Sequence, residues 1–318
     1  MKAFTKRKYG GPEVLQLEEV EIPTVKDNHI LVKVMANSAN PADWHILRGK
    51  PFFARFSFGF FKPKEAILGS DFAGIVEEIG KGVKDFKVGN RVFGEILGGG
   101  AFAEYACVQT KLCAKMPENV DFPIMASVPV AGLTAYQALV TYGKIKAGES
   151  VLINGASGGV GHFAVQIAKA YGANVTGVCS SKNIDFVKPL GAEKVIAYDK
   201  TSIQNHNIRY DLVLDTHGNL THSDYKRMGK RGVMVGFTTL GHMFSVLMKN
   251  AISKYPLTQF TEQANTDDLN TLASLVKDGK IKVHLENTYP YTRIPKAISF
   301  IEQMRTRGKI AMVWGNAN

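Results

Sequence analysis

The feature that most constrains this chain is a glycine-rich turn between an apolar strand and an amphipathic helix. Residues 151–161 read Val-Leu-Ile-Asn-Gly-Ala-Ser-Gly-Gly-Val-Gly, and apolar residues at helical spacing follow up to Tyr171. Glycine tolerates positive φ in such a turn, and without Cβ atoms the backbone can touch a bound pyrophosphate. The helix start adds free N–H groups and the positive end of its dipole. This turn, with a strand before it and a helix and strand after it, predicts a dinucleotide site.

Two sets of residues are expected to contact the dinucleotide. The backbone around Asp215–Thr216 and around Gly236–Phe237, at the ends of two later strands, is expected to face the nicotinamide. The residues predicted to hold the pyrophosphate are those of the turn: Gly155, Ser157, Gly158, Gly159, Val160 and Gly161.

The choice between NAD and NADP is expected to lie at the end of the next strand, Asn174–Cys179. NAD sites usually place Asp or Glu there, whereas this chain continues with Ser180, Ser181 and Lys182. A 2′-phosphate would find charge-assisted donors there, each worth about 1.5–3 kcal/mol. The sequence therefore predicts NADPH, with Lys182 as no more than the start of a solvated helix as the alternative. Tyr198 is predicted to cover the adenine or reach the phosphate, with a plain surface position as the alternative.

The remaining pattern divides the chain into two parts. Closely spaced strand-like runs with glycine punctuation occupy the first third and predict a small barrel or sandwich. From about residue 122 strands alternate with helices, which predicts a doubly wound parallel sheet. The fold class is thus α/β. The uncharged stretch 122–143 contains Pro123, Pro129 and Gly132, and is expected to be buried structure rather than a membrane span.

Composition narrows the partners without choosing among them. Lys and Arg total 39 against 28 Asp and Glu, a net charge of +11, which favours anionic partners such as nucleotide cofactors. No run of five like charges occurs, so no specific nucleic-acid binding is predicted. Three cysteines without a CxxC pair suggest a reducing compartment, and no apolar segment follows the basic N-terminus. We therefore expect a cytoplasmic protein.

Several motifs together resemble the medium-chain dehydrogenase/reductase superfamily. They are the glycine turn and the runs Val130–Leu139, Ala168–Ala173 and Leu190–Tyr198. Within the superfamily the chain resembles zinc-free quinone oxidoreductases, in particular the chloroplast-envelope homologues and the reticulon-interacting oxidoreductases. The resemblance implies a GroES-like, β-rich catalytic domain at 1–122, completed by 282–318, and a Rossmann NADP-binding domain at 123–281. It also implies a cleft between them, a last strand that returns to the catalytic domain, and a homodimer.

The residues expected at a catalytic zinc site are missing. The ligand positions of the zinc-dependent relatives fall near Asn40, Ser70 and Val130, which do not form a zinc-binding set. No metal site is therefore predicted, and His45 is the least dismissible ligand. Without a Lewis acid, conjugated C=C bonds and quinones are better hydride acceptors than simple ketones, because the developing charge is delocalised.

Some polar group must still meet the developing oxyanion. Asn40 is the first candidate, as a neutral amide donor, with a turn residue before Pro41 as the alternative. Asp43 could support that donor or pass a proton through water, but the pattern favours a helix-capping role for it. Thr134 is expected to begin a helix and to bond the nicotinamide amide or a phosphate, unless it only caps that helix.

Two apolar segments are open to more than one interpretation. Pro51 to Lys64 contains six phenylalanines, at 52, 53, 56, 58, 60 and 61. They could form a hydrophobic substrate entrance, adsorb peripherally to a membrane with the help of Arg55, Lys62 and Lys64, or pack under a loop. Gly241 to Ile252 could line the pocket, but it is expected instead to pack in the core or at a dimer contact.

The predicted function is NADPH-dependent hydride transfer to a small hydrophobic quinone, enone or alkenal. One alternative is an aldehyde or ketone reductase of the alcohol dehydrogenase kind. The other is an NADPH-responsive binding protein with weak turnover.

Overall fold

The computed structural model describes residues 1–96, 98–203, 206, 208–236 and 239–315. The chain forms two compact units. The first comprises Met1–Ala131, Ala264–Asp278 and Val283–Asn318, and the second comprises Gly132–Gln263 and Gly279–Lys282. The domain boundaries implied by the resemblance differ in detail, chiefly in assigning residues 264–278 to the cofactor domain, and they remain a prediction.

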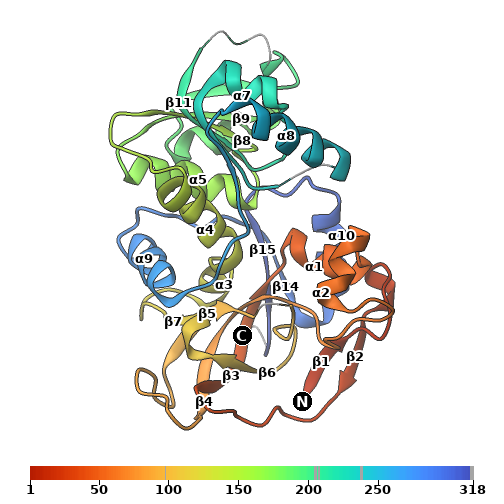
Figure 1. Cartoon of the computed structure of the whole chain (residues 1–318). Coiled ribbons are helices and arrows are strands. Elements are labelled where there is room, and N and C mark those ends of the chain that lie inside the picture. The colour runs from red at the N-terminus through yellow and green to blue at the C-terminus, as the bar shows by residue number, and fades with distance from the viewer. Residues whose placement is uncertain (97, 204–205, 207, 237–238, 316–318) are drawn as a thin grey trace. The chain divides into compact units, whose positions relative to one another are not determined.

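The second unit is a doubly wound parallel sheet (Figure 1). Its six strands lie in the order β10-β9-β8-β11-β12-β13, and every neighbouring pair is parallel. Numbered from the first strand of the unit this order is 3-2-1-4-5-6, which is the order of dinucleotide-binding sheets. The strands are β8 (Ser150–Asn154), β9 (Asn174–Cys179), β10 (Lys194–Ala197), β11 (Tyr210–Asp215), β12 (Gly229–Met234) and β13 (Leu257–Gln259).

The helices of this unit account for the period-3.6 segments of the sequence. The central strands are buried, as expected of a parallel sheet covered on both faces. The helices are α5 (Gly159–Ala170), α6 (Ile184–Val187), α7 (His222–Met228) and α8 (Leu240–Ser253). Helix α4 (Pro129–Tyr136) and a π-helical turn (Gln137–Tyr142) precede β8.

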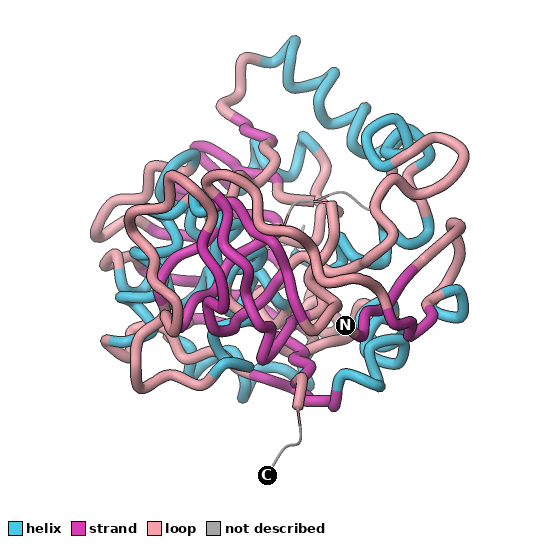
Figure 2. The backbone as a smooth tube through the Cα atoms, turned by 90° about the horizontal axis from the view of Figure 1, so that it is seen from below, coloured by secondary structure: helices cyan, strands magenta, loops and turns pink. Residues whose placement is uncertain are grey.

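The first unit is built on a GroES-like sheet of seven strands, which Figure 2 shows from below. Its order is β14-β15-β3-β4-β5-β7, and β6 pairs with β3. The strands are β3 (His29–Ser38), β4 (Asp71–Ile79), β5 (Arg91–Glu95), β6 (Tyr105–Gln109), β7 (Cys113–Lys115), β14 (Leu285–Pro290) and β15 (Lys309–Val313), and β1 (Lys2–Thr5) and β2 (Gln16–Glu19) form a separate ribbon. The helices are α1 (Pro41–Arg48), α2 (Arg55–Phe58), α3 (Phe122–Ala126), α9 (Thr266–Lys277) and α10 (Ile294–Glu302).

The expected return of the last strand to the first unit is confirmed. β15 pairs with β3 in antiparallel register, with Met312 opposite Asn37. This pairing brings the end of the chain beside the segment that leads into α1. It thereby places Lys309, the first residue of β15, close to Asn40.

The uncharged stretch 122–143 forms α3, α4 and the π-helical turn. Within the described parts of the chain, every helix is too short or too polar to traverse a lipid bilayer.

Candidate functional site

Three of the four glycines in the predicted phosphate-binding turn have surroundings that match the roles of glycine in a dinucleotide turn. Gly155 follows β8 with φ of +84°, and a Cβ there would lie 2.5 Å from the Thr216 hydroxyl oxygen. Gly161 lies in the first turn of α5, where a Cβ would stand 2.0 Å from the Gly155 carbonyl oxygen. At Gly158 the nearest atom to a Cβ is 3.5 Å away, so the backbone faces open space. These are the requirements of a dinucleotide turn: a tight bend, access for the pyrophosphate, and close packing of helix on strand.

The rest of the turn is partly exposed to solvent, and a side chain from outside the turn holds it in place. Ser157, Gly159 and Val160 are half-buried. The Asn183 amide donates to the Ser157 hydroxyl over 3.0 Å and so links the turn to the end of β9. An anion at the start of α5 would therefore meet backbone N–H groups of a pre-organised loop.

The corner after β9 contains a carboxylate that the local sequence does not reveal. Asp199 accepts hydrogen bonds from the Ser181 backbone N–H, at 2.7 Å, and from the Ser181 hydroxyl, at 2.6 Å. These bonds hold the pKa of Asp199 below its usual range. The signal that could have found it is strand register: Ala197 pairs with Cys179, so the residue two further on meets Ser181.

Of the other predicted residues of this corner, Ser180 is buried and Lys182 and Tyr198 lie at the surface. Ser180 is 9% exposed, Lys182 is exposed, and Tyr198 is 59% exposed just beyond β10. The structure therefore brings two hydroxyls, one ammonium and one carboxylate to the predicted phosphate position.

The end of β11 is organised by a buried acid. The Asp215 carboxylate accepts from the Asn154 amide at 2.8 Å and from the backbone N–H groups of His217, Gly218 and Leu220 at 3.0, 2.8 and 3.0 Å. The Asp215 side chain thus holds the loop that follows β11 in place.

Two of the residues predicted to face the nicotinamide, Thr216 after β11 and Gly236 after β12, lie close together. The Thr216 hydroxyl donates to the Asn154 carbonyl at 2.8 Å. The Thr216 carbonyl oxygen lies 3.9 Å from the position of a Cβ on Gly236, so these two residues are neighbours. Phe237 lies outside the described residues.

In the first unit the two predicted catalytic residues belong to one buried polar cluster. Asn40 precedes α1, and its amide donates to an Asp71 carboxylate oxygen at 2.8 Å. Its amide oxygen accepts from the Lys309 ammonium, which lies 3.6 Å from the same carboxylate oxygen. Asp43 accepts from the Asn40 backbone N–H at 2.7 Å and from the Ser70 hydroxyl at 3.3 Å. Asn40, Asp43, Asp71 and Lys309 are each at most 3% exposed.

Burial sets the protonation behaviour of this cluster. Loss of water raises the pKa of Asp43 to about 7, against the opposing effect of the Asn40 N–H. It also raises the pKa of Asp71 and lowers that of Lys309, although each of these two groups favours the charged form of the other. Asp43 is therefore a carboxyl group that gains and loses its proton near neutral pH.

The prediction that Thr134 begins a helix is wrong. Thr134 is an interior residue of α4, which starts at Pro129, and its side chain is 7% exposed. Helix-capping is thus excluded as its role, because the α-helical segment begins five residues earlier.

Comparisons with known proteins agree with this geometry. The alcohol dehydrogenase GroES-like domain family matches residues 26–118, and the zinc-binding dehydrogenase family matches residues 190–312. The chain is 34% identical to the chloroplast envelope quinone oxidoreductase homolog of Arabidopsis thaliana, over 98% of this chain and 97% of that one. It is also 34% identical to the NADPH-dependent alkenal/one oxidoreductase of the same plant, over 98% and 79%. The chain belongs to the quinone oxidoreductase-like family of the medium-chain dehydrogenase/reductase superfamily.

A solved structure shows the same fold. Escherichia coli quinone oxidoreductase complexed with NADPH has a TM-score of 0.84 and 27% identity, and the match covers 99% of this chain and 100% of that one. The GroES-like and Rossmann fold predictions are therefore confirmed.

The positions where zinc-dependent members of the superfamily carry ligands come together in the first unit. Ser70 and Asn40 contact the carboxylates of Asp43 and Asp71, and the Val130 backbone N–H donates to Asp71 at 3.0 Å. Among the residues that the structure describes, no group of three His, Cys, Asp or Glu side chains is placed to hold a metal ion. That the centre works without zinc remains a prediction.

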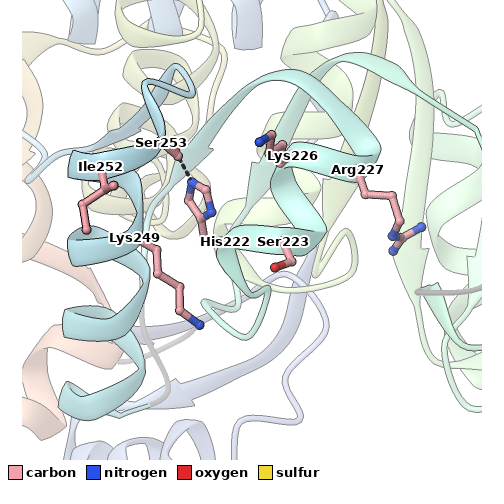
Figure 3. Close-up of a pocket in the computed structure, with 7 residues that line it drawn as sticks. All are labelled: His222, Ser223, Lys226, Arg227, Lys249, Ile252 and Ser253. Atoms are coloured by element: carbon pink, nitrogen blue, oxygen red, sulfur yellow. Dashed lines mark hydrogen bonds between the residues drawn. The ribbon is translucent and has the colours of Figure 1, made fainter.

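A cleft in the second unit contains none of the predicted site residues. It lies between α7 and α8 and has a volume of about 510 Å³. On one side of it the Ser253 hydroxyl and the His222 ring form a hydrogen bond of 2.7 Å, which is the dashed line in Figure 3. Lys226, Lys249 and Arg227 make this cleft basic.

Proposed function

We propose that this protein reduces conjugated carbonyl compounds, namely quinones, enones and alkenals, with NADPH. The observation that carries the proposal is the turn at 155–161, where Gly155 and Gly161 have no room for a Cβ atom and Gly158 leaves the backbone open to a ligand, as in a dinucleotide turn. The relatives named for quinone and alkenal/one reduction support the substrate class.

NADPH supplies hydride when it is bound. The first turn of α5 would hold its pyrophosphate, and Ser180, Ser181 and Lys182 would hold its 2′-phosphate. Tyr198, exposed beside this corner, would cover the adenine. Backbone groups at Asp215–Thr216 and Gly236, the Thr134 side chain, and Phe237 outside the described residues are proposed to contact the nicotinamide end.

In the first unit, Asn40 is proposed to stabilise the oxyanion that forms on the acceptor. Its amide nitrogen carries two hydrogens and gives one to Asp71. Lys309 on its oxygen polarises the amide and strengthens the remaining N–H as a donor.

Asp43 is proposed to hold the proton that the reduced acceptor takes up. Its Oδ2 atom accepts the Asn40 backbone N–H, so the proton would be held at Oδ1. The Ser70 hydroxyl, which donates to Oδ1 of the carboxylate, would then turn to accept from it. A pKa of about 7 lets the carboxyl both keep and release this proton at neutral pH.

The test of the reaction is NADPH consumption with matched acceptors. Each enone is compared with its saturated ketone, together with a quinone and an alkenal. We expect turnover of the conjugated compounds and at most one-hundredth of that rate with the saturated ketones. Equal rates would favour an alcohol dehydrogenase-like reductase, and saturable NADPH binding without any turnover would favour a binding protein.

The test of the catalytic residues is a pair of isosteric variants. Asn40→Asp should lower kcat about a hundredfold to a thousandfold, the effect of losing one oxyanion donor, with little change in NADPH affinity. Asp43→Asn should remove the break near pH 7 from the kcat profile. An unchanged profile in Asp43→Asn would exclude this carboxyl as the proton donor.

The test of the phosphate corner uses two opposite charge changes. Lys182→Glu should weaken NADPH far more than NADH. Asp199→Asn should strengthen NADPH about threefold to tenfold, because it removes a negative charge that also occupies the Ser181 donors. Equal effects on both cofactors would remove these residues from the phosphate site.

We further propose a cytoplasmic homodimer with peripheral membrane contact only. Three free cysteines among the described residues support a reducing compartment. Apolar residues exposed on α8 support the dimer, and the phenylalanines of residues 52–61 support the membrane contact.

A further inference from the structure

Two hydrogen bonds fix the walls of the cleft between α7 and α8. Near the start of α8, the His242 ring donates to the Leu220 carbonyl at 3.0 Å, just before α7 begins. At the end of α8, Ser253 bonds the His222 ring, which also packs edge-to-face against Tyr255 with ring centroids 6.0 Å apart. Both ends of α8 are therefore tied to the segment that forms the opposite wall, and the cleft is a built feature of this unit.

Two exposed lysines, one on each wall, bring positive charge to this cleft. Lys226 belongs to α7 and Lys249 to α8. Neither forms an ion pair or a hydrogen bond with any residue that the structure describes. In Figure 3 their ammonium groups lie apart, on opposite sides of the His222 ring. The cleft thus offers two separate cations that a ligand can reach from solvent.

The remaining charges at the cleft are already paired. Arg227 donates to the Asp224 carboxylate at 3.4 Å and to the His206 carbonyl at 2.9 Å, and in Figure 3 it points away from α8. Asp224 is 6% exposed and accepts from the Thr221 hydroxyl at 2.7 Å, so it is part of the helix cap. The described residues that line the cleft include no carboxylate. An anionic ligand would therefore meet two available cations and no lining acid.

The size and the other lining groups of the cleft indicate an organic ligand. Its volume of about 510 Å³ is in the range of small-molecule sites. Ser223 adds an exposed hydroxyl, and Ile252, which is 81% exposed, adds an apolar surface. Of the described lining residues, only Ile252 also belongs to the exposed apolar face of α8, so the cleft lies beside the proposed dimer contact.

We propose that this cleft binds a small linear dicarboxylate, with one carboxylate on Lys226 and the other on Lys249. Each ammonium carries one charge and suits one carboxylate, and the separation of the two lysines suits anionic groups at the two ends of a ligand. The hydrocarbon between them would lie along Ile252. The site contains none of the residues assigned to NADPH or to the reduction, so it is tested without an acceptor.

Two-point binding makes a prediction that general attraction to a basic surface does not. The second carboxylate of a bound ligand is held close to the second lysine, which raises its effective concentration there. A dicarboxylate long enough to reach both lysines should therefore bind at least tenfold more tightly than a monocarboxylate of equal length. A short dicarboxylate, with the same charge but less reach, should lose this advantage.

Calorimetric titration at pH 7 with suberate, succinate and octanoate tests the site. The buffer contains no carboxylate or phosphate, and NADPH is present so that the dinucleotide turn is filled. We expect one suberate per chain, and at least tenfold weaker binding of both octanoate and succinate. Equal affinity for succinate and suberate would overturn the proposal, because charge alone would then account for binding.

Three lysine variants locate the bound ligand. Lys226→Met and Lys249→Met should each weaken suberate at least tenfold and bring it close to octanoate. Lys146→Met removes an exposed lysine elsewhere in the same unit and should leave suberate binding unchanged. An unchanged thermal unfolding midpoint reports that each variant is folded. Suberate binding that survives both α7 and α8 substitutions would overturn the assignment to this cleft.

A second measurement uses the unaltered protein. Trinitrobenzenesulfonate modifies lysine amines, and mapping of the labelled peptides gives the rate at each lysine. Suberate should slow the labelling of Lys226 and Lys249 at least threefold and leave Lys146 unaffected. Absence of suberate binding at 10 millimolar, or failure to protect either lysine, would overturn the proposal, whatever the outcome of the acceptor assay.

Discussion

Buried ionisable residues of the first unit make the stability of this protein depend on pH in a way that single substitutions can isolate. The pKa of Lys6 falls to about 8 because burial disfavours the ammonium. In the unfolded chain it returns to about 10.4. Below pH 8 both states are protonated and the cost of the buried charge is fully present. Between pH 8 and 10.4 the unfolded state binds more protons, so this cost disappears as the pH rises.

Lys6→Met should therefore stabilise the protein at pH 7, by up to about 3 kcal/mol, since one pKa unit is about 1.4 kcal/mol. The gain should shrink towards zero by about pH 10.5. Urea unfolding at a series of pH values measures it, with Lys8→Met as the exposed control. A gain that is independent of pH would show that packing, and not charge, is responsible.

The part of the site that could not be predicted from the sequence is the set of contacts between side chains on different strands. Asn40 and Asp43 are adjacent enough for a capping interaction to be foreseen, but Lys309 reaches Asn40 from the other end of the chain. Asp199 reaches Ser181 from the neighbouring strand, so a motif read after β9 alone contains no carboxylate. Such contacts depend on the register between neighbouring parallel strands, and the hydrophobic pattern of the sequence does not determine that register.

At the scale of elements, segments with strong periodicity allowed their secondary structure to be predicted from the sequence, and short segments did not. The strand predicted at Asn174–Cys179 coincides with β9. Strand β13 has three residues, too few for alternation to be visible, and was not predicted. Helix α1 begins with Pro41, and the preceding Asn40 reads equally well as a turn.

The glycines of the dinucleotide turn should separate folding from binding. Gly161→Ala places a methyl group 2.0 Å from a backbone oxygen that cannot move without shifting β8 from α5. It should lower the free energy of unfolding by about 1–3 kcal/mol. Gly158→Ala meets nothing nearer than 3.5 Å, so it should fold normally and weaken NADPH at least tenfold. Urea unfolding and NADPH titration measure both, and a stable Gly161→Ala would contradict the packing argument.

The Phe-rich segment presents most of its rings to solvent. Phe58 is half-buried and packs against the core, as the packing interpretation expects, but Phe52, Phe53, Phe56, Phe60 and Phe61 are 40–89% exposed. No acidic residue lies between Lys50 and Lys64, which suits an anionic surface.

Substitution of the two most exposed rings, Phe56→Ser with Phe61→Ser, should therefore abolish flotation with vesicles that contain anionic lipid. Each ring is worth about tenfold in partitioning, from about 1.5 kcal/mol of burial. Ile22→Ser, at a 50% exposed position of the same unit, is the control. Undiminished flotation, or a wild-type protein that stays in solution, would leave the substrate entrance as the interpretation.

For the molecule as a whole, the exposed face of α8 is the surface through which we propose that two copies pair. Leu240, Phe244, Met248 and Ile252 recur every four residues and are 39%, 65%, 49% and 81% exposed, while Val246 faces the core. A stripe of this kind at the surface of a monomer is unusual, and a second copy would cover it. β13, which follows α8, is also the edge strand of its sheet.

Phe244→Glu with Ile252→Glu should therefore convert a dimer into a monomer, because two charges in each α8 stripe would be buried without partners. Light scattering after gel filtration gives the mass of each species. Met304→Glu, at a 61% exposed position of the first unit, should remain dimeric. Loss of the dimer with NADPH affinity retained would place the contact on α8 and away from the dinucleotide turn, whereas a dimer that survives both glutamates requires another surface.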